Sequence, residues 1–433
     1  MLKKAFFALL VANLMSLPQA PARAAEGENS PQAAASATEG EAGKDEAQAP
    51  AAAQVAAPAP TPAPAAAQVA EAAPTPAPPA AQVVAPAPAP AQVAEPTIPT
   101  PAPAPIKVQP EVTLRFGTIN AEGTTGYNKV IMPFAQAIEK DSGGRIEVAL
   151  KPLGGYGKPN ELFNMAEKGD IEIASTVQGY NPGRFPQSSV MELPLMYENS
   201  IAGTRAMMGL YKEGLLDKDY ASVKVLALYV LPPYPIFTTG KKIQTVRDFR
   251  GLRIRTPSVT VGLAMRKLGA IPLGVPINLI GDTLDADIVD AITYGWDSLT
   301  TTKGARNKVL ADQVNVAIDA NLAAPALMVV MNKAKWEALP ADLKAIIEKH
   351  SADLAMQSAR VREELEATSK AKIKADPRFT TLSFTAEQRQ SVERLIAPSI
   401  ADWKSDAAKR GFDGDRLYKR ARELVQQSKV AAN

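Results

Sequence analysis

The feature that most constrains the fold of this chain is a repeating order of short apolar strands and amphipathic helices that begins near Val112. Residues 112–116 alternate between apolar and polar side chains as a strand does, and residues 132–138 carry the period of a helix. Further strands are expected at 145–150 and at 171–174, with a second helical segment between them. This order predicts a mainly parallel sheet with helices on both faces.

The same order recurs later in the chain and predicts a second lobe. Strands are expected at 223–230 and 252–255, a helix at 260–268, a strongly apolar strand at 326–331, and a long amphipathic helix at 340–374. We therefore expect two α/β lobes that are linked more than once, with helices closing the C-terminal end. The expected division gives residues 111–233 and 320–360 to lobe I, and residues 234–319 and 361–433 to lobe II.

The N-terminus has the pattern of an export signal. Lys3 and Lys4 precede an apolar run, Ala5–Leu17, and Ala22-Arg23-Ala24 is a small-x-small cleavage site. Residues 1–24 are therefore predicted to be a cleaved signal peptide that directs the chain to the periplasm. The alternative is a retained membrane anchor, but the run is shorter than the ~20 residues that a membrane-spanning helix needs.

Residues 25–110 differ completely in composition from the rest of the chain. They are rich in Ala and Pro, lack aromatic residues, and repeat a unit that contains Gln-Val. Such a segment has too little apolar surface to offset the entropy lost on ordering, so it is predicted to be a disordered linker. It is either a semi-stiff spacer or a tolerated insertion without a role, and composition does not separate the two.

Composition also argues against several classes of function. The chain has no cysteine, a single histidine, His350, and a net charge of +3. Disulfides, thiolate chemistry, histidine triads and multi-histidine metal sites are thereby disfavoured, and no nucleic-acid partner is indicated. The sequence predicts no enzyme, no cofactor and no metal site. After the signal, no segment is long and apolar enough to span a membrane.

Several side chains are candidates for a ligand site in the cleft that two such lobes would form. Arg255 lies at the carboxyl end of a predicted strand, where a guanidinium can grip a carboxylate through two hydrogen bonds. Arg184 is a candidate second anion contact, or a loop charge. Tyr234 lies in a proline-rich crossover that could wall a pocket or act as a hinge. The remaining candidates follow a short acidic helix and could equally serve ordinary packing: Tyr294, Trp296 and Asp297.

In this order and spacing, several stretches resemble the DctP-type solute-binding proteins of TRAP transporters. The stretches that carry the resemblance are Gly154–Lys158 with Gly169–Ala174, Gly183–Pro186 with Glu192–Pro194, Asp248–Pro257, Leu268–Pro272, and Asn332–Pro340. The resemblance covers residues 112 to about 424 and leaves out the Ala/Pro segment. It implies a type II-like, two-lobe periplasmic binding protein with an interlobe hinge and long C-terminal helices.

The resemblance also implies a function. Members capture small organic acids between the lobes and deliver them to the membrane subunits of a TRAP permease. Arg255 matches the family's carboxylate-gripping arginine. The crossover at 231–235 lacks the second arginine of many dicarboxylate binders, and Tyr294 stands at a family asparagine position. We therefore expect a monocarboxylate with an apolar or aromatic body. A periplasmic ligand sensor for a signalling partner and an envelope scaffold are the alternative classes.

Overall fold

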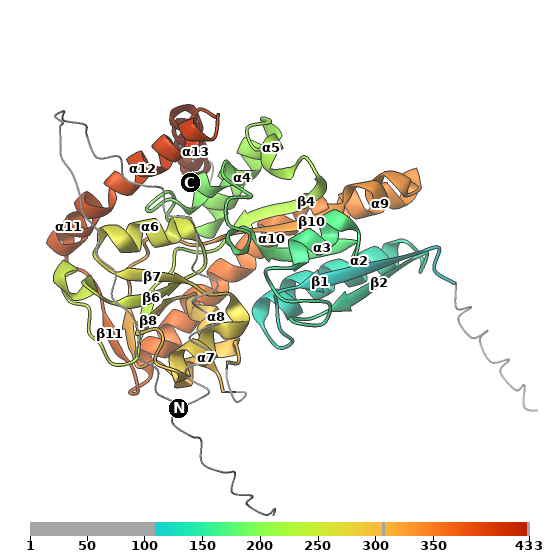
Figure 1. The fold of residues 1–433 in the computed structure, drawn as a ribbon. Coiled ribbons are helices and arrows are strands. Elements are labelled where there is room, and N and C mark those ends of the chain that lie inside the picture. Colours follow the sequence, from blue (N-terminus) through green and yellow to red (C-terminus); the bar gives the residue numbers. More distant parts are fainter. Residues whose placement is uncertain (1–108, 305–307, 431–433) are drawn as a thin grey trace, which may run out of the picture. The chain divides into compact units, whose positions relative to one another are not determined.

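The computed structural model describes residues 109–304 and 308–430, so the predicted signal peptide and nearly all of the Ala/Pro-rich linker lie outside the described residues. The described residues form two sheets, each covered by helices (Figure 1). One sheet has the strand order β2-β1-β3-β10-β4 and belongs to lobe I. The other has the order β11-β9-β5-β8-β6-β7 and belongs to lobe II. The predicted two-lobe α/β fold is therefore confirmed.

The strands of lobe I are β1 (Val112–Thr118), β2 (Ile146–Lys151), β3 (Ile173–Val177), β4 (Val223–Val230) and β10 (Ala326–Asn332). Its helices are α2 (Met132–Asp141), α3 (Leu162–Lys168), α4 (Ser200–Lys212), α5 (Asp217–Tyr220) and α9 (Lys333–Ala338), with short turns η1 (Tyr127–Ile131), η2 (Gln178–Tyr180) and η3 (Ser188–Glu192). Every residue of β10 is buried, because this strand lies inside the sheet and has helices on both faces.

The strands of lobe II are β5 (Ile236–Thr238), β6 (Arg253–Thr256), β7 (Ile271–Gly274), β8 (Ala291–Thr293), β9 (Val316–Ile318) and β11 (Thr380–Leu382). Its helices are α6 (Val259–Lys267), α7 (Ile280–Asp285) and α8 (Trp296–Thr301). Four further helices follow β10 and α9 along the chain: α10 (Ala341–Ala375), α11 (Ala386–Ile396), α12 (Pro398–Lys409) and α13 (Gly414–Val430).

Both sheets are mainly parallel, as expected, but each contains one strand that runs against the others, β10 in lobe I and β5 in lobe II. β1 pairs in parallel with β2 and β3, but β10 pairs antiparallel with β3 and β4, and β5 pairs antiparallel with β8 and β9. The cause lies in the crossovers. A chain that crosses from the other lobe enters its new sheet from the strand ends that face that lobe, so its first strand there, β10 or β5, runs opposite to the strands that end at that side.

The C-terminal helices do not follow the expected division of the chain. α10 packs on α2, α4 and β4 of lobe I and on α8 of lobe II, while α11 packs on α6. α13 packs on α4, and its Leu417, Ala421 and Val425 join the core of lobe I. The structure thus places the last helix on lobe I, although the sequence assigned residues 361–433 to lobe II, because helix periodicity does not identify the surface that a helix covers.

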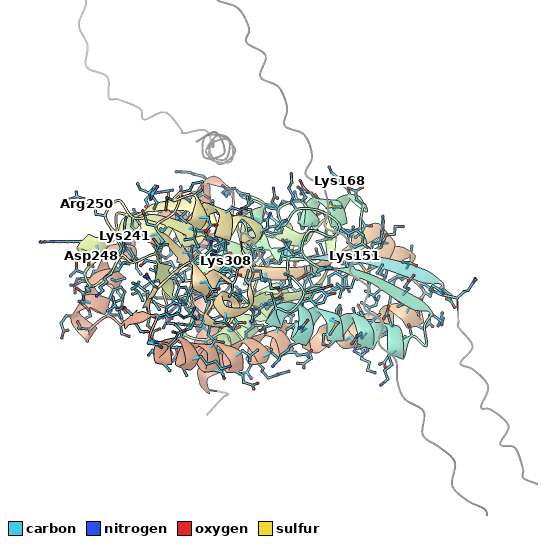
Figure 2. The ribbon with its side chains drawn as sticks, turned by 90° about the horizontal axis from the view of Figure 1, so that it is seen from below. Lys151, Lys168, Lys241, Asp248, Arg250 and Lys308 are labelled. Carbon is cyan, nitrogen blue, oxygen red and sulfur yellow. The ribbon has the colours of Figure 1, made fainter. Side chains whose placement is uncertain are left out.

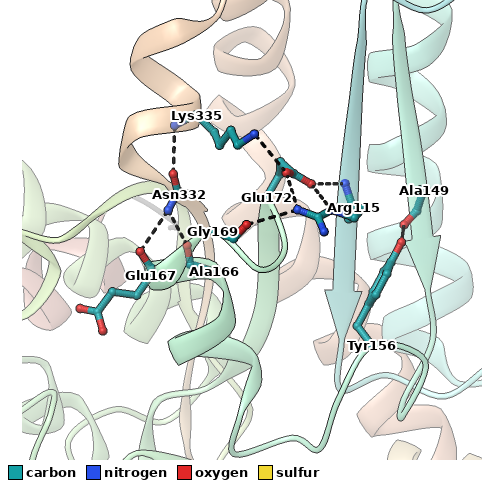
Figure 3. Close-up of polar contacts among 9 residues, drawn as sticks. All are labelled: Arg115, Ala149, Tyr156, Ala166, Glu167, Gly169, Glu172, Asn332 and Lys335. Carbon is teal, nitrogen blue, oxygen red and sulfur yellow. Dashed lines mark hydrogen bonds and ion pairs between the residues drawn. The ribbon is translucent and has the colours of Figure 1, made fainter.

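Two of the sequence motifs, Gly169–Ala174 and Asn332–Pro340, meet at one end of the lobe I sheet and stabilise it (Figure 3). The buried Glu172 accepts hydrogen bonds from Arg115 Nε at 2.9 Å and Nη2 at 2.8 Å, and Lys335 Nζ lies 3.8 Å away. Asn332 donates to the last carbonyls of α3 and accepts from Lys335 N, which caps α9. These residues tie β1, β3 and β10 together.

Charges of both signs cover the surface of the described residues. Figure 2 shows Lys151 and Lys168 on lobe I and Lys241, Asp248 and Arg250 on lobe II, all exposed. Within residues 109–304 and 308–430, no helix has both the length and the apolarity to cross a membrane.

Candidate ligand-binding site

A cavity lies between the two lobes, where strands from both sheets end. Its wall includes Val177 at the end of β3, Leu231 after β4, Arg255 near the end of β6 and Tyr294 after β8. The cavity holds about 600 Å³ of atom-free space, part of it open to solvent. This position, beyond the carboxyl ends of strands, is the usual ligand site of an open α/β sheet.

Arg255 supplies a buried guanidinium group to this cavity. Its side chain is 1% exposed, and it is fixed by Nε donating to Val275 O at 2.8 Å and Nη1 donating to Thr293 O at 3.1 Å. Nη2 lies 3.4 Å from the hydroxyl of Tyr180, which comes from lobe I. Among the described residues, no carboxylate forms an ion pair with Arg255. Its positive charge is thus held in place by neutral oxygens and remains available to an anion.

Two tyrosines give the cavity an aromatic wall. The rings of Tyr234 and Tyr294 lie 6.1 Å apart, and the Tyr294 ring is 5.9 Å from Cζ of Arg255. The Tyr294 hydroxyl bonds to Thr302 Oγ1 at 2.8 Å. Burial raises the pKa of both phenols, so both remain neutral and can pack against a ligand without adding charge.

A second arginine, Arg362 of α10, also lines the cavity and was not among the sequence candidates. It is 5% exposed, and its Nη1 lies 3.7 Å from Oδ2 of Asp297. Burial opposes the charged form of Arg362, but Asp297 and three neighbouring tyrosines outweigh it and raise the pKa of the guanidinium. Its sequence signal is the i, i+4 series Leu354, Ser358, Arg362 and Glu366, which places a charge on the buried face of the helix.

Glu366, one turn after Arg362 on α10, lies beside Arg362 and Asp297 and is the third ionisable residue of this group. It accepts hydrogen bonds from the backbone N–H groups of Trp296 and Asp297, both at 3.1 Å. Burial raises the pKa of Glu366 to about 8, and the neighbouring charge of Asp297 adds to the effect. The raised pKa favours the neutral form of Glu366, and the charges of Arg362 and Asp297 oppose each other.

The structure distributes the six candidate residues unevenly. Arg255, Tyr234 and Tyr294 line the cavity, and Asp297 lies behind its wall as the partner of Arg362. Trp296 is instead a core residue of lobe II, packed edge-on against Phe237 at 5.1 Å, because the turn after β8 directs its ring into the lobe.

Arg184 also lies away from the cavity. Its exposed side chain pairs with Glu167 and donates to Ser222 Oγ at 3.0 Å, which holds it on the surface of lobe I. In the part of the chain that the structure describes, no cluster of three or more His, Asp or Glu side chains could hold a metal ion.

Comparison with known proteins gives the same fold and a family. The model of the family described as bacterial extracellular solute-binding protein, family 7 (DctP), matches residues 116–406. The C4-dicarboxylate-binding periplasmic protein DctP of Rhodobacter capsulatus is 25% identical over 292 residues, which are 66% of this chain and 85% of that protein.

Solved structures agree. A TRAP solute-binding protein of Rhodoferax ferrireducens T118 in complex with benzoate is 29% identical, with a TM-score of 0.69 over 74% of this chain and 99% of that chain. A marine metagenome TRAP solute-binding protein specific for aromatic acids, in complex with 3-hydroxybenzoate, is 25% identical, with a TM-score of 0.68 over 74% and 99%. The family model covers about two thirds of the sequence, so this chain belongs to the DctP-type family of TRAP solute-binding proteins, as the sequence motifs predicted.

Proposed function

We propose that this protein captures an aromatic monocarboxylate in the periplasm and delivers it to the membrane subunits of a TRAP permease. The observation that carries the proposal is Arg255: a buried guanidinium with no carboxylate partner among the described residues, held at the wall of a cavity that Tyr234 and Tyr294 also line. A carboxylate would complete the charge and hydrogen bonding of this group, and the tyrosine rings suit a flat apolar body.

The balance of charge supports a monocarboxylate. Arg362 and Asp297 form an ion pair, and burial favours the neutral form of Glu366, so Arg255 is the one charge among these four residues without an opposite charge beside it. A ligand with one negative charge neutralises the site, whereas a second carboxylate would have to be buried close to Asp297. The bound aromatic acids of two solved relatives are consistent with such a ligand.

In the proposed mechanism the lobes close around the acid and no bond is made or broken. An open cleft admits the ligand, Arg255 pairs with its carboxylate, and residues of lobe I close over it. The proposal includes export by the signal at residues 1–24, and a spacer role for residues 25–110 that holds the lobes away from a surface. The protein acts as a carrier, not as an enzyme.

Isothermal titration calorimetry with benzoate, 3-hydroxybenzoate and succinate tests the proposal. We expect the wild-type protein to bind an aromatic acid and to prefer it to succinate. Arg255→Lys keeps the charge but loses the planar fork, and should weaken binding by about 1.5–3 kcal/mol, which is about 10- to 150-fold.

The matched control is Arg253→Lys. Arg253 is on the same strand but bonds to Asp290 at 2.8 and 3.0 Å, with its side chain 42% exposed, so this change should leave affinity unaltered. A strong response to succinate alone, or undiminished binding by the Arg255→Lys variant, would show that the proposed ligand class or its anchor is wrong.

A further inference from the structure

A buried donor and a buried acceptor lie unsatisfied next to the cavity. Nε of Arg362 and Oδ2 of Asp297 are inaccessible to solvent and have no hydrogen-bond partner among the described residues. The two side chains approach each other only through Nη1 and Oδ2, at 3.7 Å, which is too long for a hydrogen bond. Buried polar groups are almost always hydrogen-bonded, so this pair is an unsatisfied polar position at the cavity wall, which Arg362 lines.

The surroundings of the pair restrict what can fill that position. Arg362 lies against the loop that follows β1, because a Cβ on Gly126 would stand 2.7 Å from its Nη2 and 2.0 Å from Oδ1 of Asn120. Asp297 comes from α8 of lobe II, and its other oxygen, Oδ1, accepts a hydrogen bond from Ser298 Oγ at 2.9 Å. The polar position is thus bordered by the loop after β1 in lobe I and by α8 in lobe II.

The chemistry of the pair favours a neutral group that both donates and accepts. A hydroxyl can accept from the guanidinium of Arg362 and donate to Oδ2 of Asp297. A second carboxylate offers no donor to Asp297 and would lie beside a negative charge in a buried site. A methyl or a hydrogen would leave both groups unsatisfied.

We propose that Arg362 and Asp297 form a subsite that recognises a hydroxyl group on the body of the ligand, so that this protein selects hydroxylated aromatic monocarboxylates over their unsubstituted parent. The inference rests on the proposed function and deepens it. Arg255 binds the carboxylate, and the Arg362–Asp297 subsite discriminates between ligands that all carry that carboxylate.

Calorimetry on the full chain with benzoate, 3-hydroxybenzoate, 4-hydroxybenzoate and isophthalate tests this subsite. In the wild-type protein, the better placed hydroxybenzoate should bind about 10-fold or more tightly than benzoate, as expected of a hydrogen bond to charged groups. Isophthalate, which carries a second carboxylate, should bind more weakly than benzoate.

Asp297→Asn removes the acceptor charge and reverses the pattern. We expect the preference for hydroxybenzoate over benzoate to fall below about 3-fold, and isophthalate to gain about 10-fold relative to benzoate because Arg362 is no longer compensated. Arg362→Lys keeps the positive charge without the guanidinium fork and should also abolish the preference, which keeps the test valid if Asp297→Asn does not fold.

The matched control is Asp319→Asn. It too removes a carboxylate paired with α10, through Lys370 Nζ at 2.6 Å, but Lys370, unlike Arg362, does not line the cavity, so selectivity should be unchanged. Equal binding of benzoate and both hydroxybenzoates by the wild-type protein overturns the subsite and leaves the proposed function standing. If both Asp297→Asn and Arg362→Lys keep the preference for hydroxybenzoate, the subsite is likewise overturned and the proposed function stands. Absence of binding for all aromatic acids overturns both proposals.

Discussion

Closure of the lobes can be tested at Gly179, where lobe I touches lobe II beside the ligand cavity. A Cβ at this position would lie 2.3 Å from Cβ of Ser258 and 2.8 Å from the carbonyl oxygen of Pro257. Gly179 is in η2, attached to the sheet of lobe I, whereas Ser258 is the N-cap of α6 in lobe II. Neither residue is in a chain crossover, so we expect the contact to form when the lobes close.

The expected loss of ligand affinity in a Gly179→Ala variant follows from this geometry. In Gly179→Ala the two lobes must stay at least about 1 Å further apart to reach ordinary van der Waals contact, and overpacking of this kind costs about 1–3 kcal/mol. If the ligand-free protein is open, it does not bear that cost. The whole penalty then falls on the closed complex, and the dissociation constant should rise by about 5- to 150-fold.

The assay combines calorimetric affinity with thermal melting of the free and the ligand-saturated protein. We expect Gly179→Ala to leave the melting temperature of the free protein unchanged and to reduce the stabilisation that ligand gives. Gly274→Ala is the control, because a Cβ there meets no atom within 4 Å. A lower melting temperature of the free variant together with an unchanged dissociation constant would refute the reasoning, since the contact would then be permanent.

Two further predictions concern residues that couple or stabilise the lobes. Tyr180→Phe removes a hydroxyl that accepts from Ile277 N at 3.0 Å and faces Nη2 of Arg255, so calorimetry should show ligand affinity lowered by about 1 kcal/mol without loss of fold; unchanged affinity would exclude a role in closure. Asp290→Asn should lower the free energy of unfolding at pH 7 by about 1–3 kcal/mol, because hydrogen bonds from Arg253 depress the pKa of the Asp290 carboxyl. This stabilisation is present at a pH above about 4, the pKa of an aspartate in the unfolded chain, and is lost as the pH falls below that value. The free energies of unfolding of variant and wild type should therefore converge in acid. A constant difference across pH would contradict the role given to Asp290.

Local patterns predicted the elements of this fold well. The strand expected at 223–230 is β4, Val223–Val230, and the helix expected at 340–374 is α10, Ala341–Ala375. Both have a strong signal in the chain itself: a continuous run of β-favouring residues in the first case and a long apolar stripe in the second. The mixed pairing of β10 had no such signal, because strand direction depends on the path of the crossover.

The candidate site was predictable only where a side chain is fixed by its own strand or turn. Arg255 follows from its place at the end of β6, and Tyr234 and Tyr294 from their places at crossovers between sheet and cavity. Trp296 could not be distinguished from a ligand contact, because the rotation of one short turn decides whether its ring faces the cavity or Phe237. Arg362 was not identified from the sequence, because it is one of many charged residues in a 35-residue helix.

The second arginine shows why charge balance, and not the number of cations, determines which ligand fits. The sequence argument for a monocarboxylate rested on the absence of arginine from residues 231–235, yet Arg362 brings a second guanidinium to the same cavity from α10. A count of arginines would now favour a dicarboxylate. Asp297 at 3.7 Å opposes that charge, and burial favours the neutral form of Glu366, so of these four groups Arg255 is the one without an opposite charge beside it. The proposal of a monocarboxylate therefore rests on different physical grounds from the sequence argument, and the single change Asp297→Asn tests it.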